Sequence, residues 1–223
     1  MKVLELFKGT GSIGNVVKNL DENNEVISLD IESRYRPTIC CDIMTWDYKQ
    51  YSRGYFDLVT ASPVCLFWSN LRNSWIGRKI KSHGDTIITR EILQEDIDTI
   101  GKPMVDRTIE IIEYFRPKYW WIENPSSGKM KHYITEKYPQ YDTYFDFDYC
   151  KYSTYGYKKS TRFWTNIEGL EPLRCKNDCE NMSETNAKKH KITLGHIGGG
   201  GNRDMRYRIP SKLIECLLEK AEI

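Results

Sequence analysis

The chain has 223 residues, a length that allows one full domain with a small appendage. Hydrophobic residues make up 39%, charged residues 29% and aromatic residues 13% of it, which is typical of a globular protein and excludes a disordered or fibrous one. The sequence has no apolar run of transmembrane length and no secretory signal at its first residues, so we expect a soluble, intracellular protein without membrane contact.

Charge and cysteine content restrict the partners and the compartment. The formal net charge is +2, so a polyanion would have to be held by local basic patches rather than by the field of the whole molecule. Two such patches are present, although charge clusters are also common on solvated surfaces. Their members are Arg72, Arg78, Lys79 and Lys81, and Lys151, Lys158, Lys159 and Arg162. Seven cysteines at irregular spacing favour reduced thiols over a disulfide framework.

Short apolar segments that end in a polar residue or a proline recur along the first half of the chain. They predict strands at residues 2–6, 25–31, 37–43, 56–62 and 119–125. The spacing of apolar residues predicts helices over residues 12–20 and 104–117, the first of them after a glycine-rich turn. Strands that alternate with helices indicate an α/β fold with a mostly parallel sheet and helices on both faces.

The second half of the chain is less regular. Alternating polar and aromatic residues over 145–166 predict a pair of strands at the far edge of the sheet. Periodicity is lost from residue 167 to 205, where the glycine run 198–201 is expected to form a flexible joint. A last helix within residues 209–223 has a proline at its start and leucines on one face.

Chemically distinctive residues follow directly after several predicted strands. The carboxyl ends of parallel strands meet at one edge of a sheet, which is where ligands bind. Asp30 can accept from both hydroxyls of a ribose, and Asp42 is placed to accept from an adenine amino group. A fold that binds NAD consists of two mononucleotide-binding halves, and no second half follows in this chain. The sequence therefore favours S-adenosylmethionine over NAD as the cofactor. The residues expected at this edge are Gly9, Gly11, Asp30, Asp42, Cys65 and Glu123.

The order of the short motifs resembles that of the DNA cytosine-5 methyltransferases, in particular the short phage and large-virus members of that family. The motifs that carry this resemblance are LELFKGTGSIG, SLDI, CDI, ASPVCLFWS, ENP, TRFWTN and RYRIP. They extend from Leu4 to about Leu217, apart from residues 170–205. The resemblance implies a Rossmann-like methyltransferase fold, S-adenosylmethionine as cofactor, DNA as partner, and the cytoplasm of a bacterial or viral host as compartment.

The resemblance assigns a catalytic role to three residues. Cys65 matches the cysteine whose thiolate adds to carbon 6 of cytosine, which enables carbon 5 to attack a sulfonium methyl group. Glu123 matches the glutamate that donates to ring nitrogen 3, a task that requires a dry pocket to raise its pKa. Arg162 matches the basic residue that contacts the base oxygen and stabilises the cysteine loop, residues 61–69.

Binding residues follow from the same motifs. Asn124 would help to fix the cysteine loop, and the loop after Ser69, with Trp75, would close over a base flipped out of the duplex. The residues expected to contact DNA are Asn124, Arg72, Arg78, Lys79 and Lys81. The residues expected to contact the cofactor are Phe7, Gly9, Gly11, Asp30, Ile31, Asp42, Ile43 and Pro63.

Three features depart from the family pattern. Val64 stands where a second proline is usual and Leu66 where glutamine is frequent, so the cysteine loop is less pre-organised. Ser160 stands where an additional arginine is common, with Lys158 and Lys159 nearby as substitutes. The residues between TRFWTN and RYRIP are too few for a large target-recognition domain, so sequence specificity should be short or loose.

These observations divide the chain into three parts. Residues 1–169 form the predicted catalytic domain, residues 170–205 a small irregular segment that serves as a reduced target-recognition element, and residues 206–223 a helix that packs back on the catalytic domain.

Two functional alternatives stay open. A weak or inactive methyltransferase-like binding protein is favoured by Val64 and Ser160 but opposed by Cys65 and Glu123. RNA could replace DNA, because a tRNA-directed branch of the family shares these motifs.

The irregular segment contains four residues of the types that bind zinc. Cys175, Cys179, His190 and His196 have a spacing compatible with a zinc site, to which Cys150 or Cys40 could add a ligand. The pattern is less specific than paired CxxC motifs, and unpaired thiols in a loop are the alternative. The sequence alone therefore assigns no metal ligand.

Overall fold

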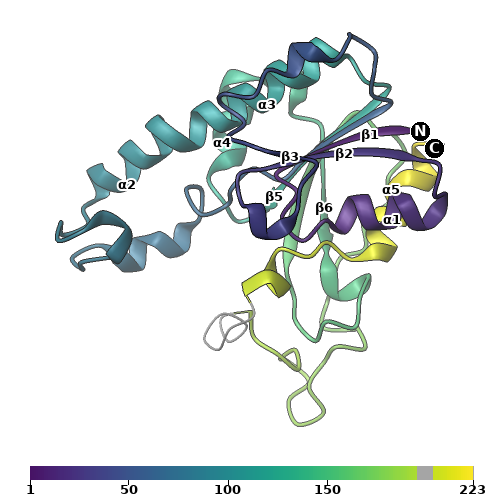
Figure 1. Ribbon diagram of the computed structural model, residues 1–223. Helices are drawn as coiled ribbons and strands as arrows, with labels where there is room; N and C mark the ends of the chain where they lie inside the picture. Colours follow the sequence, from purple (N-terminus) through teal and green to yellow (C-terminus); the bar gives the residue numbers. More distant parts are fainter. Residues whose placement is uncertain (195–202, 223) are drawn as a thin grey trace.

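The apolar segments of the first half of the chain form neighbouring strands of one sheet (Figure 1). In the computed structural model, which describes residues 1–194 and 203–222, the strands run in the order β3-β2-β1-β4-β5-β7-β6. Their bounds are Lys2–Leu6 for β1, Glu25–Asp30 for β2, Ile39–Cys40 for β3, Leu58–Ala61 for β4, Tyr119–Pro125 for β5, Tyr144–Asp148 for β6 and Ser160–Thr165 for β7. Neighbouring strands from β3 to β5 are parallel, whereas β7 is antiparallel to both β5 and β6.

Helices cover both faces of the sheet, as predicted (Figure 1). Their bounds are Ser12–Leu20 for α1, Arg90–Asp96 for α2, Lys102–Phe115 for α3, Met130–Lys137 for α4 and Ser211–Lys220 for α5. Successive side chains of a strand point to opposite faces. On β5, therefore, Trp121 packs in a core with α1 and α5, while Ile122 packs in a second core with α3 and α4.

The strands and helices expected in the first half of the chain are present, and the α/β fold is confirmed. β1, α1 and β5 have the predicted bounds, and β6 and β7 form the predicted pair at the far edge. β3 is shorter than predicted because the chain turns at Asp42, whose carbonyl accepts from the backbone N–H groups of Thr45 and Trp46.

Sequence analysis missed α2 and α4. α2 continues through the wide turn Ile97–Gly101 directly into α3, so the two helices form one continuous element. Gly101 and Pro103 conceal this continuity, because both residues are unfavourable inside a regular helix. A Cβ atom at Gly101 would lie 3.2 Å from the ring of Trp68, so the glycine permits the cysteine loop to pack closely on the helix.

The C-terminal part returns to the sheet after an irregular segment. Within that segment Met182 and His190 form an isolated antiparallel bridge. The expected glycine joint, 198–201, and His196 lie outside the described residues. α5 packs on α1, and the backbone N–H of Ile209 donates to Ser12 Oγ at 3.1 Å. Among the described residues, no helix combines the length and the apolar character needed to cross a membrane.

The sheet order creates one place where loops diverge. β1 and β4 are neighbours, but the chain leaves β1 toward β2 on one side and leaves β4 toward β5 on the other. A crevice at such a switch point is the usual ligand site of a parallel α/β sheet. The glycine-rich turn follows β1 and Cys65 follows β4, so both lie at this point.

Candidate active site

The glycine-rich turn after β1 is held at the end of β2 by a hydrogen bond to Asp30. Gly9 and Gly11 have φ angles of 47° and 69°, in the left-handed region that glycine adopts without strain. The N–H of Gly9 donates to Asp30 Oδ2 at 2.7 Å, and the N–H of Glu32 donates to Asp30 Oδ1 at 2.8 Å. Each carboxylate oxygen has a further lone pair, so Asp30 can hold the turn and still accept from a ribose.

A buried carboxylate that the sequence analysis missed stands beneath this turn. Glu5, next to the last residue of β1, accepts from the N–H groups of Ile13 and Gly14 at 3.2 and 3.3 Å. Burial raises the pKa of Glu5 to about 7. A Cβ atom at Gly14 would lie 2.8 Å from the Glu5 carboxylate, which explains the third glycine of the motif. The signal available in the sequence was an acid in an otherwise apolar strand.

The other expected cofactor residues are in different environments. Ile31 is 65% exposed beside Asp30, so an apolar side chain is open to a ligand there. Asp42 Oδ1 accepts from the N–H of Met44 at 2.9 Å, which fixes the turn after β3. Ile43 is buried in the core beside this turn, and its expected contact with the cofactor stays a prediction.

The cysteine loop is attached to the end of β5. Asn124 Nδ2 donates to the carbonyl of Pro63 at 2.8 Å, and both residues are buried. The carbonyl of Trp68 accepts from the N–H of Lys129 at 2.8 Å, at the start of α4. Val64 and Leu66, the departures from the family pattern, are 41% and 43% exposed and lie on either side of Cys65. The loop is therefore held by its neighbours rather than by a second proline.

Glu123 lies in β5, 6% exposed, and accepts from two side chains. Tyr149 Oη donates to Glu123 Oε1 at 3.1 Å, and burial raises the pKa of Tyr149, which keeps the phenol a donor. Lys159 Nζ lies 3.5 Å from the same oxygen and also donates to the carbonyl of Arg206 at 3.1 Å. Lys159, the residue before β7, therefore contacts both Glu123 of the ENP motif and Arg206 of the RYRIP motif.

The same charges act on Cys65. Burial raises the pKa of the Cys65 thiol, the ammonium of Lys159 opposes this effect, the carboxylate of Glu123 adds to it, and Arg206 lowers it. Cys65, Glu123 and Lys159 therefore form one electrostatic unit at the carboxyl edge of β4 and β5. The sequence alone places Lys159 only in a basic patch and among the substitutes for the missing arginine.

The structure does not bring Arg162 to this unit. Arg162 makes a bidentate ion pair with Asp146, at 2.7 and 3.0 Å, and its guanidinium lies 3.4 Å from the ring centroid of Tyr144. In the register between β5 and β7, Glu123 is opposite Phe163, so Arg162 points to the other face of the sheet. The expected contact of Arg162 with the base is thus corrected: its partner is β6.

Arg72 also has a different role from the one expected. It is 3% exposed, forms an ion pair with Asp96, and its guanidinium lies 5.2 Å from the ring centroid of Trp75. Burial acts to raise the pKa of Asp96, but hydrogen bonds from Arg72 and His83 outweigh it and lower that pKa. Arg72 therefore fastens the loop to α2 and is not available to a phosphate.

The other basic residues of the loop are exposed to solvent and could contact a phosphate. Arg78, Lys79 and Lys81 are exposed, and Lys79 pairs with Ile87 in a short antiparallel bridge. The N–H of Ile88 donates to the carbonyl of Arg78 at 3.0 Å, which strengthens this hairpin-like arrangement. In Figure 1 the loop and α2 extend away from the sheet on the side opposite α5.

Comparison with known proteins agrees with the resemblance seen in the motifs. A Frog virus 3 (isolate Goorha) protein, named as a probable DNA (cytosine-5)-methyltransferase, is 38% identical over 229 residues, which cover 98% of this chain and 99% of the relative. The chain belongs to the DNA (cytosine-5)-methyltransferase family. The viral source of the relative fits the expected large-virus type. No family model matches the chain.

Two solved structures are similar to the chain at low sequence identity. A methyltransferase of Entamoeba histolytica is 16% identical with a TM-score of 0.49, over 78% of this chain and 56% of its own. A candidate DNA modification methyltransferase from an Escherichia coli prophage is 13% identical with a TM-score of 0.42, over 74% of this chain and 46% of its own. The family assignment rests on the viral relative alone.

The charges around Cys65 predict opposite effects of two substitutions on its reactivity. We expect Lys159→Met to slow the alkylation of Cys65 by iodoacetamide, because removal of the cation raises the pKa of the thiol further. Glu123→Gln should accelerate alkylation, because it removes a negative charge. A pKa change of one unit alters the thiolate fraction about tenfold, so effects of a few-fold to about tenfold are expected at pH 8.

Peptide mass spectrometry measures the modified fraction of each cysteine over time. The exposed thiol of Cys40 in the same samples is the internal control, because it lies in β3, at the edge of the sheet opposite β6. Equal rates in both variants, or faster alkylation in Lys159→Met, would show that these charges do not act on Cys65.

Proposed function

We propose that the protein transfers a methyl group from S-adenosylmethionine to carbon 5 of cytosine in DNA, with Cys65 as covalent nucleophile. The observation that carries the proposal is the placement of Cys65, Glu123 and Lys159 in one unit beside the glycine-rich turn. Membership of the family and the description of the viral relative support the reaction type.

The chemistry requires the ring to be activated before methylation. Carbon 5 of cytosine is a weak nucleophile, so the Cys65 thiolate adds to carbon 6, and the electron pair displaced from the ring double bond makes carbon 5 nucleophilic. S-adenosylmethionine, when bound, supplies the methyl group as a sulfonium electrophile. Loss of the proton at carbon 5 then restores the double bond and expels the Cys65 thiolate.

Glu123 and Lys159 have complementary tasks in this scheme. Glu123 is placed to contact ring nitrogen 3 as carbon 6 is attacked, and it can donate there once its carboxylate has taken up a proton. Tyr149 and Lys159 fix the carboxyl group through Oε1. Lys159 also stabilises the thiolate of Cys65, since its charge lowers the pKa of that thiol. We assign to Lys159 the task in the cysteine loop that the family resemblance gave to Arg162.

The cofactor residues fit S-adenosylmethionine. The backbone at Gly9 and Gly11 lacks side chains that would separate it from a ligand, and Asp30 retains acceptor capacity for a ribose. Ile31 offers an exposed apolar side chain next to Asp30. The alternative of an inactive binding protein is not favoured, because the viral relative is named as a probable DNA (cytosine-5)-methyltransferase.

Cytosine methylation itself tests the proposal. We expect 5-methylcytosine, measured by nucleoside mass spectrometry, in DNA incubated with the wild-type protein and S-adenosylmethionine. Cys65→Ser should abolish the product, because a hydroxyl is a far weaker nucleophile than a thiolate. Cys216→Ser is the matched control, since Cys216 is exposed on α5, and it should retain wild-type activity. Equal product from Cys65→Ser and wild type would contradict the proposed nucleophile.

Cofactor binding depends on the charge of Asp30. Asp30→Asn keeps the shape of the side chain but removes the charge that strengthens hydrogen bonds to ribose hydroxyls, which are worth roughly 1.5–3 kcal/mol each. We expect calorimetry to show one S-adenosylmethionine per wild-type chain and affinity weakened at least about tenfold in Asp30→Asn. Glu32→Gln, at an exposed neighbour, should leave affinity unchanged. Binding of NAD instead would overturn the cofactor assignment.

The exposed lysines and arginine of the loop predict a salt-dependent affinity for DNA. Affinity should fall with salt at a slope of about 0.9 per neutralised phosphate on a duplex. Joint replacement of Arg78, Lys79 and Lys81 by glutamine should therefore flatten the slope. Lys18→Gln with Lys220→Gln, on exposed positions of α1 and α5, is the control and should not change it. An unchanged slope in the triple variant would place DNA on another surface.

A further inference from the structure

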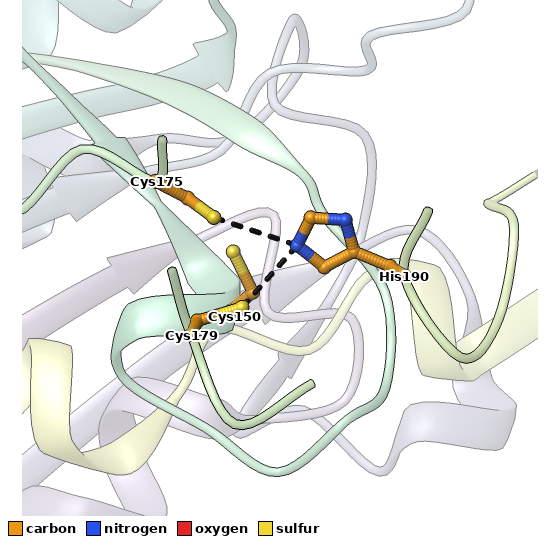
Figure 2. Close-up of side chains that lie close together, drawn as sticks. All are labelled: Cys150, Cys175, Cys179 and His190. Carbon is orange, nitrogen blue, oxygen red and sulfur yellow. Dashed lines mark hydrogen bonds between the residues drawn. The ribbon is translucent and has the colours of Figure 1, made fainter. Parts of the chain in front are cut away.

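We propose that Cys150, Cys175, Cys179 and His190 bind one zinc ion (Figure 2). These residues come from three separate pieces of chain: the turn after β6, the loop after β7, and the bridge formed by Met182 and His190. Their Sγ and imidazole nitrogen atoms all lie within 4.8 Å of one another. The structure thus selects Cys150 as the fourth ligand over Cys40, which lies exposed at the opposite edge of the sheet.

The distances suit a tetrahedral ion. His190 Nε2 lies 3.6 Å from Cys175 Sγ and 3.3 Å from Cys179 Sγ. With Zn–S bonds of about 2.3 Å and Zn–N bonds of about 2.0–2.1 Å, two ligand atoms of a tetrahedral site lie about 3.5–3.8 Å apart. Figure 2 shows the thiols and the imidazole directed toward a common point. Small side-chain rotations therefore complete the coordination.

Hydrogen bonds hold the ligand backbone in place. Asn181, 3% exposed, donates from its side-chain Nδ2 to the carbonyl of Cys150 at 2.8 Å. The backbone carbonyl of Asn181 accepts from the N–H of Lys191 at 2.8 Å. The N–H of Cys175 donates to Asp148 Oδ2 at 2.7 Å. This second layer fixes the residues around all three pieces of chain, as is usual for a zinc site.

The set of groups fits zinc better than a disulfide. A disulfide would join two of the thiols and leave the third beside an imidazole nitrogen that lies between Cys175 and Cys179. Three thiolates and Zn²⁺ carry a net charge of −1, and Lys158 Nζ donates to the carbonyl of Cys175 at 2.9 Å, close to that charge. Four protein ligands leave no open position, so the ion would be structural rather than catalytic.

The position of the site gives the ion a second effect. Cys150 directly follows Tyr149, which donates to Glu123, and the N–H of Tyr149 donates to the carbonyl of Lys159 at 3.0 Å. Zinc would therefore join the segment from Cys175 to His190 to the piece of chain that positions Glu123. This effect on the active site rests on the proposed function, whereas the zinc site itself does not.

Metal content of the full-length protein tests the site directly. After purification without chelators, elemental mass spectrometry should find about one zinc per chain, and thiol titration should find no disulfide. Joint replacement of Cys175 and Cys179 by serine should remove the zinc, while Cys216→Ser should retain it. Metal-free wild-type protein, a Cys175–Cys179 disulfide, or zinc that persists in the double variant would each overturn the proposal.

Cobalt provides a second readout on the wild-type protein, which does not depend on the folding of a variant. Co²⁺ exchanged into the site should give the intense visible absorption of tetrahedral coordination and a thiolate-to-metal charge-transfer band. Removal of the metal by a chelator should lower the melting temperature, because the ion binds only the folded chain. Octahedral cobalt spectra would exclude the four-ligand site. Neither measurement requires methyl transfer, so failure of the proposed function leaves this test unaffected.

Discussion

The hydrogen bond from Asn124 to the carbonyl of Pro63 joins the ends of β4 and β5, and the geometry of the candidate active site depends on it. β4 and β5 are parallel neighbours with Ala61 opposite Ile122, so the residues that follow the two strands emerge at the same edge. Pro63 cannot extend the strand by donating a hydrogen bond, and the chain turns there toward Cys65. Asn124 then fixes this turn to the strand that carries Glu123, which compensates for the loss of a second proline at Val64.

We propose that the charges of Glu123 and Lys159 serve chemistry rather than stability. The side chains of Glu123 and Lys159 are only 8% and 11% exposed at a separation of 3.5 Å. Desolvation of two buried charges offsets most of their mutual attraction, so such a pair is weak support for the fold. Its effect on Cys65 is specific, because burial raises the pKa of the thiol and Lys159 opposes this change. We propose that this arrangement sets the pH at which the Cys65 thiolate forms.

The sequence predicted the strands, most helices and the sheet edge at which the candidate residues lie, because those features follow from local periodicity and strand order. It could not predict which side chains of the basic patches face the site. Arg162 and Lys159 are three residues apart, and only the pairing of Glu123 with Phe163 shows that Arg162 points to the other face. Arg72 was misassigned because its partner, Asp96, lies 24 residues later on a helix that was missed.

The most direct test of the account is covalent trapping with DNA that contains 5-fluorocytosine. Carbon 5 of this base has no proton to lose after methylation, so the bond between Cys65 and carbon 6 cannot be released. We expect a denaturation-resistant protein–DNA complex that requires S-adenosylmethionine, is absent in Cys65→Ala and is strongly reduced in Glu123→Gln, since general-acid help is typically worth about 10²–10⁴ in rate. If DNA and S-adenosylmethionine both bind but no Cys65-dependent complex forms over long incubation in varied cytosine contexts, the account is wrong.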